Sequence, residues 1–192
     1  MVSKSERTRQ RIVDAANQLF YRKGYGRTSI SNVEAEAGVP RGNIYYYFKS
    51  KEEILQAVIE QRLENTATML LEWNRSIEHP LGRLQRLVRV ITDSTPALLR
   101  SGCPMGTLNL ELAKDQPTLA AEGRRLFDLF QQWAERQFTE LGYPEQAREL
   151  SLHLLARGQG IIVIAQLYQD AGFLEQGCRE IDHWLEQLAP YA

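Results

Sequence analysis

The stretch GVPRGNIYYYFKSKEEIL, residues 38–55, decides how the N-terminal part of the chain folds. Gly38 can end a helix in the left-handed conformation, and Pro40 is favoured in the first turn of the helix that follows. We expect that short helix to cover residues 41–48. Ser50, with a glutamate three residues later, has the pattern of a capping box, which opens another helix directly behind it.

Two helices are expected before this stretch. Between residues 6 and 22, apolar residues recur at spacings of three and four, which gives that segment one apolar helix face. The face consists of Ile12, Ala15, Ala16, Leu19 and Phe20. Thr28 or Ser29 is a suitable N-cap for a short second helix, which Gly38 ends. Two short helices on a tight glycine-containing turn, braced by a longer amphipathic helix, make a helix-turn-helix.

The rest of the chain predicts further helices, because no window alternates apolar and polar residues with a sustained period of two. They are expected at residues 51–75, 81–100, 104–114, 118–141, 145–170 and 174–188. The expected fold class is therefore all-α, with about nine helices in total. We expect residues 1–50 to form a three-helix helix-turn-helix domain, and residues 51–192 to form a second helical domain.

The charge of the chain is distributed unevenly. Its 23 Lys and Arg residues and 24 Asp and Glu residues give a net charge of -1. Residues 1–52 hold ten of the basic and five of the acidic residues, so this part carries +5 and the remainder carries -6. A basic head on an acidic body is the pattern of a chain that meets phosphate groups at one end only.

Residues 38–55, together with AANQLFYRKGY at residues 15–25, closely resemble the signature of the TetR family of transcriptional regulators. The order of the apolar, Gly, Tyr, Phe and Ser-Lys-Glu positions carries the resemblance, which implies a transcriptional regulator that binds double-stranded DNA. Residues 1–50 are then expected to be its DNA-binding domain, and residues 51–192 its regulatory domain for ligand binding and dimerisation. The helix-turn-helix, which is the expected DNA reader, is joined to the next helix without a flexible linker. We therefore expect a repressor that binds an inverted-repeat operator as a homodimer and is released by an effector. A DNA-binding activator, or an architectural protein without a ligand, is the alternative.

The third expected helix presents groups that can read DNA. Ile44 and Phe48 lie four residues apart and can pack inward, which leaves the other side chains facing outward. Arg41 at the helix start can make a bidentate contact to guanine, and Asn43 can pair with adenine. Gly42 has no side chain, so it lets the helix approach the groove closely.

Three tyrosines follow on the same helix. The resemblance implies that Tyr45 and Tyr46 give their hydroxyl groups to phosphates, while Tyr47 stands where many family members have histidine. Simple packing of all three aromatic rings is the alternative. Lys51, in the first turn of the next helix, can form an anion site with the free backbone N–H groups there. The full set of expected DNA contacts is Ser29, Ser31, Arg41, Gly42, Asn43, Tyr45, Tyr46, Tyr47 and Lys51.

The last two expected helices, residues 145–170 and 174–188, carry more apolar surface than one small subunit readily covers. Packed against the same helices of a second copy, they would form a four-helix interface, as the resemblance implies. The alternative is that these apolar residues all belong to the core of a single chain.

A space between the regulatory helices is expected to hold the effector. Aromatic and apolar residues are its candidate walls and two polar residues its candidate anchors, with core packing as the alternative for each. The walls are Trp73, Met105, Leu108, Phe127, Phe130, Trp133 and Phe138, and the anchors are Asn109 and His153. Such a pocket suits a hydrophobic or aromatic small molecule.

Cys103 is a candidate sensor. It stands in RSGCPMG at the expected start of a helix, where the helix N-terminus and nearby Arg100 favour the reactive thiolate. The stretch GCPMGTLNLELA resembles the corresponding region of electrophile-sensing TetR-family members, which implies release from DNA by an electrophile or an oxidant. The alternative is a small buried hydrophobic residue, and this interpretation is also favoured for Cys178.

Other function classes have little support in the sequence. Glu180 and His183 have the spacing of half a di-iron helix-bundle motif, but the second Glu-x-x-His is absent, and neither cysteine belongs to a CxxC pair. We therefore expect no enzymatic activity, no cofactor and no metal site. The N-terminus has no apolar stretch behind its charges, and the aliphatic run at residues 161–165 is too short for a bilayer, so we expect a cytoplasmic protein.

Overall fold

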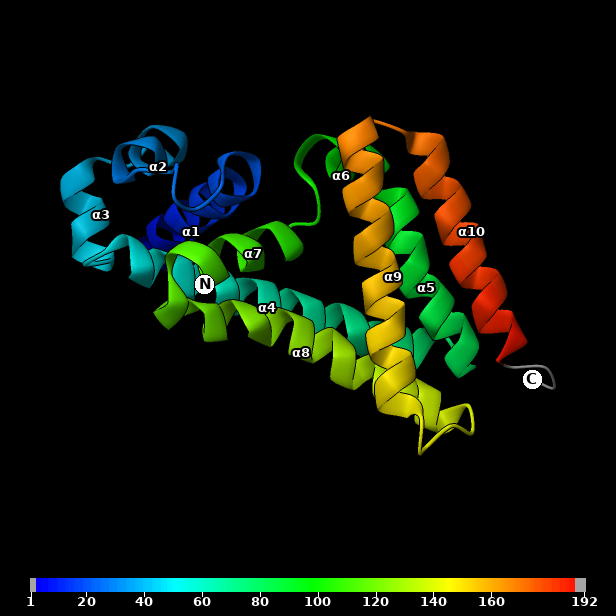
Figure 1. Cartoon of the computed structure of the whole chain (residues 1–192). Coiled ribbons are helices and arrows are strands. Elements are labelled where there is room, and N and C mark those ends of the chain that lie inside the picture. The colour runs from blue at the N-terminus through cyan, green and yellow to red at the C-terminus, as the bar shows by residue number, and fades with distance from the viewer. Residues whose placement is uncertain (1–2, 189–192) are drawn as a thin grey trace. The chain divides into compact units, whose positions relative to one another are not determined.

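The computed structural model describes residues 3–188, and these residues form ten α-helices (Figure 1). In chain order the helices are α1 (Lys4–Lys23), α2 (Ile30–Ala37), α3 (Arg41–Tyr47), α4 (Lys51–Ser76), α5 (Pro80–Asp93), α6 (Thr95–Ser101), α7 (Gly106–Asp115), α8 (Pro117–Glu140), α9 (Ala147–Tyr168) and α10 (Ala171–Gln187). The all-α fold class predicted from the sequence is confirmed.

The helix expected at residues 81–100 is in fact two helices. Helix α5 ends at Asp93 and α6 begins at Thr95, with Ser94 between them. Pro96 lies in the first turn of α6, where a proline is tolerated because the N–H groups of that turn have no partner within the helix. Inside a continuous helix the same proline would lose its hydrogen bond to the carbonyl of Thr92, and its ring would clash with that carbonyl.

The helix boundaries around α2 and α3 follow the predicted signals. Ser29 is the N-cap of α2, and its side chain accepts a hydrogen bond from the backbone N–H of Asn32 at 3.2 Å. Gly38 ends α2 in the left-handed conformation, with a φ of 58°. Pro40 is the N-cap residue of α3, one position earlier than the first turn in which the sequence places it.

The start of α4 uses a variant of the predicted capping box. The hydroxyl group of Ser50 accepts from the backbone N–H of Glu53 at 3.3 Å, as expected. The carboxylate of Glu53 accepts from the N–H of Lys49 at 2.7 Å, so it caps the residue before Ser50. Both side chains take up N–H groups that have no partner within the helix.

The chain divides into two compact units. The first comprises Met1–Asn65 with Thr107–Leu126, and the second comprises Thr66–Gly106 with Phe127–Ala192. Leu108, Leu112 and Leu119 share one buried core with residues of α1 to α4, which explains why α7 and the start of α8 belong to the first unit. The functional boundary after residue 50 stays a prediction, because it concerns which residues bind DNA.

The core of the first unit is formed by apolar side chains from all of its helices. Ile12 on α1, Ile44 on α3 and Ile54 on α4 are each fully buried. The rings of Phe20 and Tyr25 meet edge to face, with their centroids 5.2 Å apart, beside this core. Burial of these side chains stabilises α3 in the unit, although α3 is too short to be stable alone.

Candidate DNA-binding interface

Helix α3 separates its residues into an inward and an outward face. Ile44 and Phe48 are buried, as the sequence predicts. The side chain of Tyr46 is 75% exposed and that of Tyr45 is 39% exposed. One turn of this helix therefore offers a continuous set of polar groups to a partner, while its other side is fixed in the core.

The first turn of α3 is open to solvent. Arg41, Gly42 and Asn43 are all exposed, and a Cβ atom added at Gly42 would meet nothing within 4 Å. The fold itself therefore does not require glycine there. The Arg41 guanidinium lies 5.8 Å from the centroid of the Tyr45 ring, and hydrogen bonding to Tyr45 raises the pKa of Arg41 above its ordinary value. Arg41 is thus a permanently charged donor at the outward end of the helix.

Tyr47 differs from its two neighbours because it is partly buried. Its hydroxyl group accepts a hydrogen bond from the Ser5 hydroxyl at 3.3 Å, which ties α3 to the first turn of α1. Its ring meets that of Tyr46 edge to face at 5.0 Å. Tyr47 thus has a contact within the chain, and its contact with DNA stays a prediction.

The two serines at the start of α2 are both exposed. The hydroxyl oxygen of Ser29 already accepts the N-cap hydrogen bond, so the hydroxyl hydrogen is the group that can be given to a phosphate. Ser31 lies in the first turn of the same helix, where the partial positive charge of the helix N-terminus favours an anion. Their DNA contacts also stay predictions.

Lys51 has intramolecular partners that the sequence did not indicate. Its ammonium group donates to the carbonyl oxygens of Tyr25 and Thr28, each at 3.1 Å, and lies 4.2 Å from the centroid of the Tyr25 ring. Two of its three N–H donors are therefore used by the turn before α2. The phosphate contact predicted for Lys51 stays a prediction, with one donor left to make it.

Tyr25 lies at the centre of that turn and was not among the predicted site residues. It is 2% exposed, and its hydroxyl group donates to the Glu52 carboxylate at 3.2 Å. Burial, reinforced by the negative charge of Glu52, raises the pKa of Tyr25 well above its usual range. The Glu52 carboxyl has a lowered pKa, chiefly because its own backbone N–H and the Ser50 hydroxyl donate to it, so this pair is a neutral phenol beside a carboxylate.

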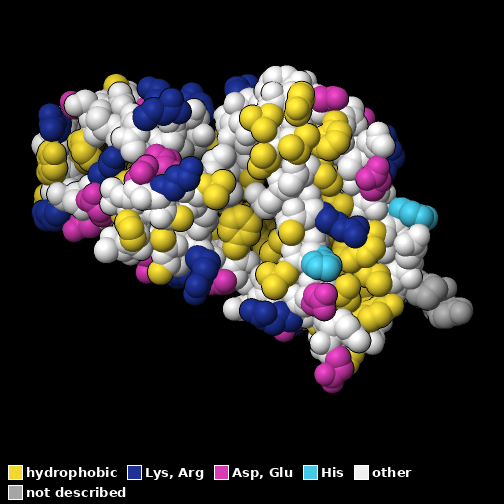
Figure 2. All heavy atoms as spheres, viewed as in Figure 1, with side chains coloured by type: hydrophobic (Ala, Val, Ile, Leu, Met, Phe, Trp, Pro, Cys, Tyr) yellow, Lys and Arg dark blue, Asp and Glu magenta, His cyan; other side chains and the backbone are white. Residues whose placement is uncertain are grey.

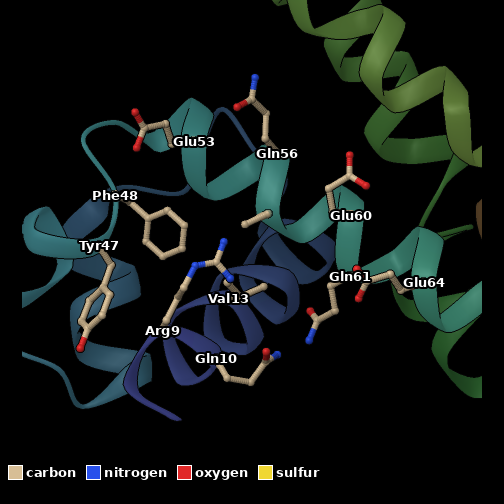
Figure 3. Close-up of a pocket in the computed structure, with 11 residues that line it drawn as sticks. Arg9, Gln10, Val13, Tyr47, Phe48, Glu53, Gln56, Glu60, Gln61 and Glu64 are labelled. Carbon is tan, nitrogen blue, oxygen red and sulfur yellow. The ribbon is translucent and has the colours of Figure 1, made fainter. Parts of the chain in front are cut away.

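A groove of 440 Å³ lies between α1, α4 and the end of α3 (Figure 3). The Arg9 guanidinium reaches into it and lies 5.0 Å from the centroid of the Phe48 ring. Its remaining polar lining is dominated by carboxylates and amides, and the lining residues are Arg9, Gln10, Val13, Tyr47, Phe48, Glu53, Gln56, Ala57, Glu60, Gln61 and Glu64. Three carboxylates against one guanidinium disfavour a phosphate group, so this groove is not part of the candidate DNA-binding interface.

Among the candidate effector residues, Cys103 and Trp133 are buried in the second unit. Cys103 is 7% exposed, and its sulfur accepts hydrogen bonds from the Gln159 amide at 3.3 Å and from the N–H of Gly106 at 3.4 Å. Trp133 is 1% exposed, and its indole N–H donates to the Asn74 side chain at 3.0 Å. Both residues pack in one core with partly buried Met105.

The other candidate effector residues are placed differently. Asn109 belongs to the first unit, where its amide donates to the carbonyl of Gly123 at 3.0 Å, so it joins α7 to α8. His153 is exposed on α9, with a side chain that is 58% accessible and lies 4.0 Å from Glu149. Phe127 is partly buried. The effector roles of all these residues, like those of Cys103, Met105 and Trp133, stay predictions.

An apolar face on α9 and the start of α10 lies open on the second unit. Figure 2 shows hydrophobic side chains gathered over these two helices. Leu167 is 72% exposed and Tyr168 is 77% exposed. Gly160 lies on the exposed side of α9, and a Cβ atom there would meet nothing within 4 Å. The exposed apolar residues are Leu152, Val163, Ile164, Leu167, Tyr168 and Phe173.

Helix α9 is strongly apolar in composition. Ala147–Tyr168 has the length and hydropathy of a membrane-spanning helix, a test that the core helix of a soluble protein also passes, and 28% of its most apolar window is buried within this chain. Eleven of the 22 residues of α9 are exposed in the single chain.

Comparisons with known proteins agree with the helix-turn-helix and extend beyond it. Residues 12–58 match the family model of bacterial regulatory proteins of the tetR family, and residues 80–179 match the C-terminal domain model of LmrA/YxaF-like transcriptional regulators. An uncharacterised HTH-type transcriptional regulator of Lactococcus lactis is 31% identical over 172 residues, which cover 88% of each chain.

Two further proteins are similar to this chain, one in sequence and one in fold. The HTH-type transcriptional repressor DhaR of Mycobacterium sp. is 29% identical over 130 residues, which cover 66% of this chain and 62% of that protein. The crystal structure of a TetR-family regulator from Agrobacterium tumefaciens superimposes with a TM-score of 0.83 at 19% identity, covering 94% of this chain and 98% of that one. Together with the two family models, this similarity shows that the chain belongs to the tetR family of bacterial regulatory proteins.

Proposed function

We propose that this regulator is a cytoplasmic repressor that binds an inverted-repeat operator as a homodimer and leaves the operator when an effector acts on the regulatory helices. The observation that carries the proposal is α3, whose Ile44 and Phe48 are buried while Arg41, Gly42 and Asn43 are exposed. Two copies of such a helix fit successive major grooves about 34 Å apart on one side of a duplex.

The homodimer is supported by the apolar face of α9 and α10. Exposed apolar side chains gathered on one pair of helices are typical of an interaction site. The face also includes Gly160, whose missing side chain allows two helices to approach closely. Two copies of α9 and α10 would cover each other in a four-helix arrangement, related by a twofold axis.

The operator is identified by selection. Purified protein is mixed with genome fragments, and the bound fragments are recovered and sequenced. We expect a short inverted repeat, and fluorescence anisotropy should show that this repeat binds far more tightly than random DNA at the same salt concentration. Recovery of fragments without a shared sequence would favour the alternative, an architectural protein. Transcription from the recovered promoter, with and without the protein, separates repression from activation.

The predicted base contact of Arg41 gives a direct test of the reader. Arg41→Ala should weaken operator binding by about 1 to 3 kcal/mol and relax the preference at particular base pairs. Because Arg41 is exposed, the free energy of unfolding of this variant should remain close to that of wild type. Anisotropy titrations against a set of single-base operator variants measure both effects. Equal losses on the operator and on random DNA would mean that Arg41 contacts the phosphate backbone instead.

We propose Cys103 as the site at which an electrophile or an oxidant acts. Its sulfur accepts hydrogen bonds from the Gln159 amide and from the N–H of Gly106, and the thiolate is the form of a cysteine that reacts with electrophiles. A quinone should release wild-type protein from its operator, whereas Cys103→Ser should stay bound. Anisotropy of labelled operator during a quinone titration measures the release.

Cys178 provides the matched control for this test. It is 2% exposed, and burial raises the pKa of its thiol to about 11, so it remains protonated at neutral pH. Cys178→Ser should therefore respond to the quinone as wild type does. Release of Cys103→Ser at the same dose as wild type would rule out Cys103 and favour a reversibly bound hydrophobic or aromatic effector.

A further inference from the structure

In the turn between α1 and α2, main-chain N–H groups have no partner within a helix. A side chain that is distant in the sequence accepts their hydrogen bonds. Glu111, on α7, accepts the N–H of Tyr25 with Oε2 at 2.9 Å and the N–H of Gly26 with Oε1 at 2.6 Å. Each carboxylate oxygen therefore takes one donor. Hydrogen bonds to an ionised acceptor are about twice as strong as those between neutral groups.

The turn has a shape that admits this carboxylate. A Cβ atom added at Gly24 would lie 3.0 Å from Oε2 of Glu111, and one at Gly26 would lie 3.0 Å from Oε1. Gly24 also has a φ of 88°, a conformation that L side chains rarely adopt. The sequence Gly-Tyr-Gly thus leaves room on both sides of Tyr25 for a single acidic side chain.

The carbonyl groups of the same turn are bound by a side chain of α4. Lys51 binds the carbonyl oxygens of Tyr25 and Thr28, and the Tyr25 hydroxyl binds Glu52. The N–H groups of the turn are thus held from α7 and its carbonyl groups from α4. The next residue, Ser29, is the N-cap of α2, so these contacts hold the segment that leads directly into α2.

Helix α7 is itself firmly placed within the first unit. Asn109 donates to the carbonyl of Gly123 on α8, and a Cβ atom at Gly123 would lie only 2.9 Å from the Asn109 side chain, so the two helices approach closely. Leu108 and Leu112 are buried in the core of the unit. A displacement of α7 would carry Glu111 with it and break the two hydrogen bonds to the turn.

We propose that Glu111 is a positioning residue of the DNA reader: by holding the turn at residues 24–28 it keeps α2 and α3 in the arrangement that binds DNA, and release of this contact lowers operator affinity. The proposal rests on the proposed role of α3 as the reader of the operator. It assigns to α7, which lies outside the helix-turn-helix, direct control over the geometry of that motif.

Three variants of the full-length protein test the proposal. Glu111→Ala removes both acceptors, while Glu111→Gln keeps the size of the side chain but places an amide N–H against one of the two donors. We expect operator affinity to fall by about tenfold or more in both variants, because neither side chain can make the two charge-assisted hydrogen bonds of the carboxylate. Asp115→Asn removes a negative charge from an exposed position of the same helix, so it controls for the change in net charge and should bind as wild type.

Hydrogen exchange separates positioning from a general loss of stability. The amides of Tyr25 and Gly26 should exchange faster in Glu111→Gln, while amides in the core of α1 and α4 keep their protection. Gly26→Ala should weaken operator binding in wild type, because its Cβ presses on the carboxylate, and should add nothing in the Glu111→Ala background. Additive effects in this cycle, or operator affinity of Glu111→Gln equal to that of wild type, would overturn the proposal. Wild-type protein without any operator preference would instead overturn the proposed function, and this inference with it.

Discussion

A protein that carries Ile164→Glu and Leu167→Glu together is expected to sediment as a monomer and to lose nearly all of its operator affinity. Both side chains lie on the exposed apolar face of α9, 40% and 72% accessible in the single chain. Pairing with a second copy would bury four carboxylates against apolar surface, which costs far more than the contacts return. The interface is therefore expected not to form.

The loss of DNA binding should be much larger than that of any single contact. A dimer binds the second half-site as an intramolecular step, and loss of such linkage lowers affinity by about 10²- to 10⁴-fold. Analytical ultracentrifugation at micromolar concentration gives the oligomeric state, and anisotropy gives the affinity. Leu71→Glu, at a position on α4 that is 55% exposed, is the matched control and should stay dimeric. A double variant that sediments as a dimer would place the interface elsewhere.

The sequence predicts the reader well because its signals are local. Ser29 and Gly38 mark the ends of α2 by their own capping preferences, and the spacing of Ile44 and Phe48 defines the inward face of α3. Each of these features depends on neighbours within about four residues, so a pattern in the sequence is enough to find it.

The contacts that hold the reader in place could not be predicted in the same way. Glu111 and Tyr25 are separated by 86 positions, and Glu111 is one acid among several in the acidic part of the chain. No periodicity links the two. The one local signal was the pair of glycines around Tyr25, since glycine at such positions indicates that another group approaches the backbone closely.

Asn109 shows the same limit for a residue that was predicted from the sequence. The sequence predicts Asn109 as a polar anchor for an effector, and in the structure its amide donates to the carbonyl of Gly123 on α8, a contact that does not test the predicted role. A buried polar group must find a partner, and the sequence alone does not say whether that partner is a ligand or the backbone of a neighbouring helix.

Lys51→Met is expected to destabilise the protein as well as weaken its binding to DNA. Methionine keeps the length and apolar character of the side chain but removes the ammonium group. The carbonyl oxygens of Tyr25 and Thr28 then lose their donor, and the Tyr25 ring loses a cation 4.2 Å from its centroid. We expect the free energy of unfolding to fall by about 2 kcal/mol, the cost of leaving partly buried acceptors without a donor.

The salt dependence of binding then separates the two roles of Lys51. If its remaining donor also meets a phosphate, Lys51→Met weakens operator and random DNA alike, and the slope of log affinity against log salt concentration falls by about one. If Lys51 acts only on the turn, the slope stays unchanged while the unfolding free energy falls. Lys23→Met, which removes an exposed charge from α1, is the control for net charge and should leave the stability unchanged. An unaltered unfolding free energy of Lys51→Met would mean that the contacts of Lys51 with the turn contribute nothing to the stability of the folded state, and would leave DNA binding as the only role of its ammonium group.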